Sequence, residues 1–298
     1  MLEGQRKPLA EREAFYRRAL ALDPGFVGAH LQLANDAFES AGAGVPQQQA
    51  RDRSVAHLEM ALKLDPRSAE AHGRWASAES LVDNIEAMRS HALKALELDS
   101  NGVPGLFWSA RLAQEAGQMD EALSLFGRLA DADPLDWFAQ LSQAQALRLA
   151  GHPKTALAAV ERSLAIDNTR EGRHLKATIL ADLGRREEAR EMARQLGSVS
   201  LSAALGSAEE LAALDRRTDL NSHQRGWVDL ALGRHAAFVA HAQEHVHDLG
   251  WRADALFNPL FDPVRKLPAF TAWLEQCKLT QSHERAQAWR KANPPAGG

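Results

Sequence analysis

The sequence predicts an all-α fold of stacked antiparallel helix pairs, and three observations support this prediction. Amphipathic stretches rich in Ala and Leu recur along the chain, and each ends at an Asp. Four of these residues stand at a constant interval of 34 residues: Asp65, Asp99, Asp133 and Asp167. In the later units a Gly is followed five residues on by an Ala, at Gly117, Gly151 and Gly184. A unit of this length is two helices that must stack on the next pair to bury their apolar faces.

Each recurring residue type has a physical reason within a helix pair. Gly supplies the left-handed backbone conformation that closes the first helix, and Ala lets the two helices approach closely. Pro just after the second helix prevents its continuation, as in the similar endings 19–24 and 61–66. The sequence therefore places a first helix, a turn and a second helix in each full unit.

These recurring positions resemble the tetratricopeptide repeat. The family pattern has a Leu-Gly pair in the first helix, and here the small residue at the Gly position is an Ala at residues 34, 76, 110 and 144. The resemblance covers roughly residues 9–196, within an array that we place at residues 1–196, and implies a right-handed superhelical solenoid of helix pairs.

The first two units depart from the strict period. Residues 10–22 read as a second helix whose first helix is missing, so we expect a truncated first repeat in a chain that continues a longer polypeptide. The interval between Asp23 and Asp65 is 42 residues, which predicts an insertion near residues 40–49, at the Gly-rich stretch Ser40–Pro46.

Beyond residue 196 the period fails but helical patterning continues, and we expect diverged helical repeats over residues 197–250. The stretch from Ser207 to Glu210 has the spacing of a capping box, and Asn221 or Ser222 can cap the next helix. Residues 227–234 and 236–249 then read as a last helix pair.

We call residues 251–298 the closing segment. A string of Pro, Phe-Asp, Arg, Pro and Phe at residues 259–270 resembles the segment that closes tetratricopeptide arrays in bacterial winged-helix transcriptional regulators and class III adenylyl cyclases. The last helix pair of a stack leaves an apolar flank with no following neighbour. We expect the closing segment to cap that flank with Phe257, Leu260, Phe261, Phe270, Trp273 and Leu274.

Composition excludes several classes of protein. The net charge is -4 and basic residues are interleaved with acidic ones, which argues against a nucleic-acid surface. The single cysteine, Cys277, cannot form an internal disulfide. No apolar run could span a membrane and no apolar leader opens the sequence, so we expect no membrane contact and a cytoplasmic location. A periplasmic setting and the oligomeric state stay open.

The sequence indicates no enzyme active site and no cofactor. It has no Gly-rich phosphate loop, nucleophile elbow or recognisable pair of carboxylates. His241 and His245 have the one-turn spacing of two metal ligands, but Ala242 stands where the zinc-protease motif has Glu. A metal-dependent enzyme that uses this histidine pair is therefore only an alternative.

The tetratricopeptide resemblance implies a partner-binding surface on the concave face made by the first helices. Matching the family's contact positions gives eight candidates: Asn35, Phe38, Phe107, Arg111, Gln114, Phe138, Gln145 and Arg148. Amides, aromatic rings and guanidinium groups are the side chains that an extended peptide uses. The alternative is that these aromatic side chains pack between helices and the polar groups face water.

We therefore expect a protein-interaction module that binds a protein or peptide partner, as the regulatory or sensor part of a larger bacterial signalling protein. A free-standing assembly scaffold is the alternative. The sequence does not identify the partner.

Overall fold

The computed structural model describes residues 8–244 and 249–294, and all regular structure in these residues is helical, which confirms the all-α prediction. The chain forms two compact units, residues 1–109 and 110–298, and the division falls within helix α6. The expected limits at residues 196 and 250 follow the repeat pattern and stay predictions. None of the described helices combines the length and the apolar character that a membrane span requires.

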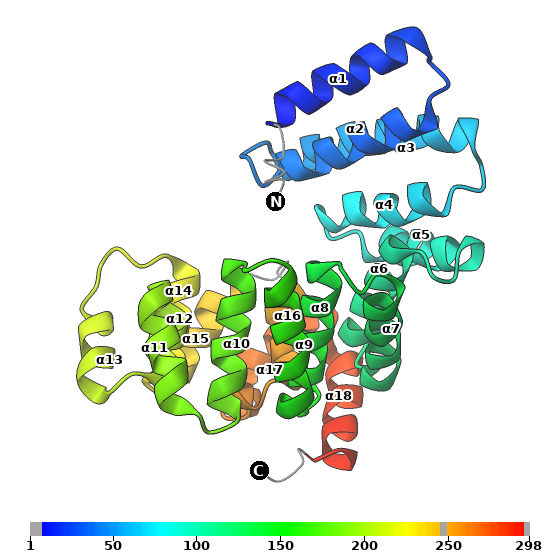
Figure 1. Ribbon diagram of the computed structural model, residues 1–298. Helices are drawn as coiled ribbons and strands as arrows, with labels where there is room; N and C mark the ends of the chain where they lie inside the picture. The colour runs from blue at the N-terminus through cyan, green and yellow to red at the C-terminus, as the bar shows by residue number, and fades with distance from the viewer. Residues whose placement is uncertain (1–7, 245–248, 295–298) are drawn as a thin grey trace. The chain divides into compact units, whose positions relative to one another are not determined.

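Between residues 8 and 109, the described part of the first unit, the chain forms five complete helices and the start of a sixth. Figure 1 draws them in order along the chain. They are α1 Leu9–Leu22, α2 Val27–Ser40, α3 Gln47–Leu64, α4 Ala69–Ser80, α5 Ile85–Leu98 and α6 Val103–Glu115. Helices α2 and α3 form one pair, α4 and α5 form the next, and the first helices α2 and α4 contact each other. Small residues dominate the core between the pairs, including Ala34, Ala61 and Ala71, because helices packed this closely leave little room.

The second unit continues the helix pairs and ends in the closing segment. Its helices are α7 Met119–Ala132, α8 Trp137–Leu149, α9 Pro153–Ile166, α10 Arg170–Asp182, α11 Arg186–Leu196, α12 Val199–Leu205, α13 Ala208–Asp215, α14 Ser222–Ala231, α15 His235–Gln243, α16 Leu249–Phe257, the short 3-10 helices η1 Pro259–Phe261 and η2 Val264–Lys266, α17 Pro268–Gln276 and α18 Thr280–Ala292.

The periodic Asp residues link each repeat to the next. At Asp23, Asp65 and Asp99 the backbone is extended, so the preceding helix ends there. The carboxylate then accepts the backbone N–H two residues later, at 2.9 Å from Gly25, 3.1 Å from Arg67 and 3.0 Å from Asn101. This side-chain turn directs the chain into the following first helix, which gives a physical reason for the period.

The turns between the two helices of a repeat follow the sequence prediction. Gly117, Gly151 and Gly184 have φ values of 78°, 79° and 76°, which confirms the left-handed turn after the first helix. The expected insertion near residues 40–49 stays a prediction; α2 ends at Ser40, α3 begins at Gln47, and α3 has 18 residues where α5 and α7 have 14. Ser207 and Glu210 form the predicted capping box of α13.

The closing segment forms one core with the last helix pair, α14–α15. Phe261, Phe270, Trp273 and Leu274 are buried there with Phe238 of α15. The Trp273 indole donates a hydrogen bond to the Ala242 carbonyl oxygen at 3.1 Å. Of the six expected capping residues only Leu260 stays exposed, at 49%. Its place on the outer side of η1 follows from the short helical turn that buries Phe261 beside it.

The closing segment also reaches the turn between α6 and α7. A Cβ atom added at Gly117 would clash with the Ser282 carbonyl oxygen and would lie 3.1 Å from the Ala286 nitrogen, both in α18. Gly117 therefore serves two purposes, the left-handed turn and the close approach of α18.

Replacement of Gly117 by Ala should destabilise the second unit more than Gly184→Ala does. Both positions have a left-handed backbone, which costs an Ala about 1 kcal/mol. Only Gly117 faces another helix, since a Cβ at Gly184 meets nothing within 4 Å. We expect an additional loss of about 1 to 3 kcal/mol at Gly117, measured by urea unfolding. Equal losses at the two positions would show that α18 does not dock on this turn.

Candidate partner-binding surface

In the first unit, two of the predicted contact residues lie one helical turn apart on α2. Asn35 and Phe38 are both half-buried, so each keeps part of its side chain exposed. The Asn35 amide donates a hydrogen bond to Glu39 Oε1 at 2.8 Å. This contact fixes the orientation of the amide and leaves its oxygen to accept a hydrogen bond from a bound backbone N–H.

Arg12 of α1 forms ion pairs with the same stretch of α2. Its guanidinium lies 2.7 Å from Asp36 and 2.5 Å from Glu39. Burial raises the pKa of the Asp36 carboxyl, although Arg12 opposes this shift. The ion pairs join α1 to the part of α2 that carries Asn35 and Phe38.

Phe107 is the third predicted contact residue in the first unit. It lies on α6, is half-buried, and packs edge-to-face against Trp108 with ring centroids 5.0 Å apart. The Trp108 indole in turn donates a hydrogen bond to the Ser77 hydroxyl of α4 at 2.7 Å. Phe107 is thus fixed by the packing of one first helix on the next.

In the second unit, the predicted polar residues on α6 and α8 are largely used within the protein. Gln114 is 1% exposed and accepts a hydrogen bond from Arg111 at 2.9 Å. The Arg148 side chain is 8% exposed and lies 2.7 Å from Asp182 of α10 and 4.0 Å from Asp254 of α16. These contacts give Gln114 and Arg148 structural roles.

The two other predicted residues of α8 are more accessible. Phe138 is 42% exposed and packs edge-to-face on Trp137, with ring centroids 5.8 Å apart. Gln145 is half-buried. Phe138 lies at the start of α8, and Gln145 lies two turns later, within one turn of Arg148.

The closing segment contacts the end of α6 and the start of α7. Arg252 of α16 is 4% exposed and lies 2.5 Å from Glu115 of α6. Trp289 of α18 donates a hydrogen bond to Asp120 at the start of α7, at 2.8 Å. Figure 1 shows the chain returning from α15 to α18 beside these earlier helices. Sequence reasoning missed this return, because Arg252 and Trp289 belong to no motif.

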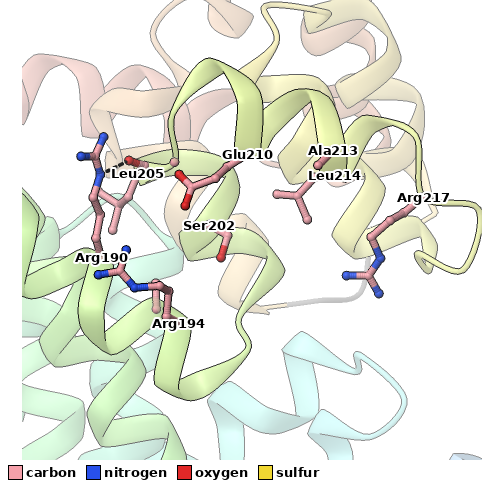
Figure 2. A pocket seen from close by; sticks show the side chains of 10 residues that line it. Arg190, Arg194, Ser202, Leu205, Glu210, Ala213, Leu214 and Arg217 are labelled. Carbon is pink, nitrogen blue, oxygen red and sulfur yellow. Dashed lines mark hydrogen bonds between the residues drawn. The ribbon is translucent and has the colours of Figure 1, made fainter.

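A pocket of about 460 Å³ opens between α11 and α13 (Figure 2). Leu205 and Ser202 of α12 line it. The pocket is also lined by three arginines and a glutamate: Arg190, Arg194, Arg217 and Glu210. Each of the arginines already has a carboxylate partner, at Glu187, Glu191 and Asp219. The charges therefore balance locally, and the pocket does not attract an anion by net charge.

The described residues contain no group of three His, Cys, Asp or Glu side chains that could hold a metal ion. His241 lies 3.3 Å from Asp229 and 3.1 Å from the Ser222 hydroxyl, both on α14. Its predicted partner His245 lies outside the described residues.

The comparisons with known proteins give structural similarity only. No protein-family profile matches the chain, and no curated protein matches it. A solved structure of YrrB, a TPR protein with an unusual peptide-binding site, is 17% identical and has a TM-score of 0.42; the match covers 66% of this chain and 96% of that one. TTC0263, a TPR protein from Thermus thermophilus, is 18% identical, with coverage of 69% and 98% and a TM-score of 0.46.

PilF from Pseudomonas aeruginosa is 18% identical over 83% of this chain and 99% of its own, with a TM-score of 0.45. At these identities and TM-scores the similarities carry no argument about the function of this chain.

The contact between Arg252 and Glu115 should hold α16 in place. Replacement of Arg252 by Met keeps the apolar stem but leaves Glu115, whose side chain is 13% exposed, without this partner. We expect a loss of about 3 kcal/mol in the free energy of unfolding and faster proteolysis within α16.

The double variant Glu115→Gln with Arg252→Met is the matched control. It removes both charges, so it should recover part of the lost stability. A double variant no more stable than Arg252→Met would contradict a charge pair as the source of the effect.

Proposed function

We propose that this chain is a protein-interaction module that holds an extended peptide segment of a partner along the first helices of its first unit. The observation that carries the proposal is the pairing of Asn35 with Phe38 on α2. Both side chains are partly exposed, and α2 lies against α4, the first helix of the next repeat.

The chemistry of these side chains suits a peptide. The Asn35 amide can bond the backbone of an extended chain, which has unpaired N–H and C=O groups along its length. Phe38 lies one turn further along the same face and can receive an apolar side chain of the peptide. Aromatic side chains, Phe among them, are enriched at protein interfaces.

The second unit contributes less to this proposal. Its closing segment contacts α6, α7 and α8, and it engages Glu115 and Asp120 directly. We assign a binding role there only to Phe138 and Gln145, because both side chains keep part of their surface exposed.

The expected regulatory role in a bacterial signalling protein is part of this proposal and rests on the sequence string at residues 259–270. The structure gives this string a packing role. Arg265 donates hydrogen bonds to the carbonyl oxygens of Ala255 and Asn258, and Phe261 packs on Phe238 with ring centroids 5.2 Å apart.

A selection of random peptides displayed on phage against the full chain should yield binders that depend on Asn35 and Phe38. For a selected peptide, Asn35→Ala should weaken binding by about 1 kcal/mol and Phe38→Ala by about 2 kcal/mol, as measured by fluorescence anisotropy.

Met60→Ala is the matched control, because Met60 is 39% exposed but lies on α3, a second helix. It should leave the affinity unchanged. Peptides that bind the Asn35 and Phe38 variants as tightly as the original chain would place the binding surface elsewhere, and a selection without binders would contradict peptide binding.

A further inference from the structure

Two histidine pairs join the first helix of a repeat to the second in the first unit. His30 of α2 and His57 of α3 face each other with their Nδ1 atoms 3.2 Å apart. His72 of α4 and His91 of α5 do the same at 3.0 Å. At these distances one Nδ1 must carry a proton and donate it to the other, so each contact requires at least one neutral ring.

The two pairs occupy the same positions in successive repeats. His30 and His72 are each the fourth residue of their first helix, counted from Val27 and Ala69. His57 and His91 each stand eight residues before the Asp that ends their second helix. The third repeat has Leu106 and Leu125 at these two positions, and the fourth has Gln140 and Ala159. The helix pair therefore does not need histidines there to fold.

The His72–His91 pair belongs to a larger buried network. The His91 ring stacks on Trp75 with centroids 4.5 Å apart and planes 9° apart. The Trp75 indole donates a hydrogen bond to Glu79 at 3.0 Å, and Glu79, which is 1% exposed, also lies 2.5 Å from Arg51 of α3. The network connects α3, α4 and α5, so protonation of His91 also affects the contacts of Trp75 and Glu79.

Some of the charged groups around the pairs raise the pKa of the histidines, and others lower it. Glu13 and Arg17 of α1 and Arg53 of α3 surround His57. Lys94 of α5 lies near His72, and Glu79 of α4 lies near His91. Glu79 and the face of Trp75 both attract a charged imidazole.

Burial and the neighbouring histidine outweigh that attraction. Burial, followed by His72, lowers the pKa of His91 to about 4. Burial also lowers the pKa of His57, with His30 as the next cause, and lowers the pKa of His72, with Lys94 as the next. The unfolded chain therefore binds more protons than the folded one below the ordinary histidine pKa of about 6.5. The contribution of these neutral histidines to the free energy of unfolding is fully present above that pH and is lost progressively as the pH falls below it.

We propose that the two histidine pairs make the first unit an acid-sensitive element, in which a fall from about pH 7 to about pH 5 lowers the free energy needed to separate the facing imidazoles and so loosens each first helix from its second. Two imidazolium rings cannot share the space in which one proton now lies between two nitrogens. The fourth repeat, α8–α9, lacks histidines at these positions and keeps its packing.

Amide hydrogen exchange of the full chain at about pH 7, 6 and 5 tests the proposal, after correction for the intrinsic exchange rates. Protection of α4 and α5 should fall by up to about tenfold per pH unit below about 6.5 for each histidine that stays neutral in the fold. Helices α8 and α9 are the internal control and should fall less steeply. Equal slopes in the two repeats would overturn the proposal.

The double variant His72→Leu with His91→Leu reproduces the third repeat and should remove the extra pH dependence of α4–α5. An unchanged slope in this variant would also overturn the proposal. If the variant does not fold, a titration of the His91 ring protons by NMR in the original chain decides instead. A midpoint near 4 supports the proposal, and an ordinary midpoint near 6.5 contradicts it.

Discussion

The structure depends on one constraint, which is that a helix pair can bury only one of its two apolar flanks by itself and needs another element to cover the other. Inside the stack the next pair provides this cover, as α4 does for α2. At α14–α15 no further pair follows, and the closing segment covers the flank with Phe261, Phe270 and Trp273. At the other end, α1 has no fully buried residue, and Phe15 and Leu22 are 64% and 90% exposed.

The local features of the fold could be predicted because each depends on a few neighbouring residues. The turn glycines and the capping box at Ser207 follow from backbone conformations and hydrogen bonds that span only a few positions. The return of α16 and α18 could not be predicted in this way. Arg252 and Glu115 are 137 residues apart, and nothing in the sequence near either residue marks the other.

The candidate site shows the same limit. Helical periodicity places Asn35, Phe38, Gln114 and Arg148 on first helices, but it does not tell what covers each of them. Asn35 and Phe38 remain partly exposed on α2. Gln114 and Arg148 are occupied by contacts with Arg111, Asp182 and Asp254, which only the tertiary structure brings together.

The long-range contacts of the closing segment affect how the second unit folds during synthesis. In a simple repeat array every contact joins neighbours, so each pair can settle on the previous one as soon as the ribosome releases it. Trp289 meets Asp120 across 169 residues, so the turn after α6 waits for nearly the whole unit to be synthesised. Such non-local closure slows folding and prolongs the exposure of apolar surface while the second unit is being made.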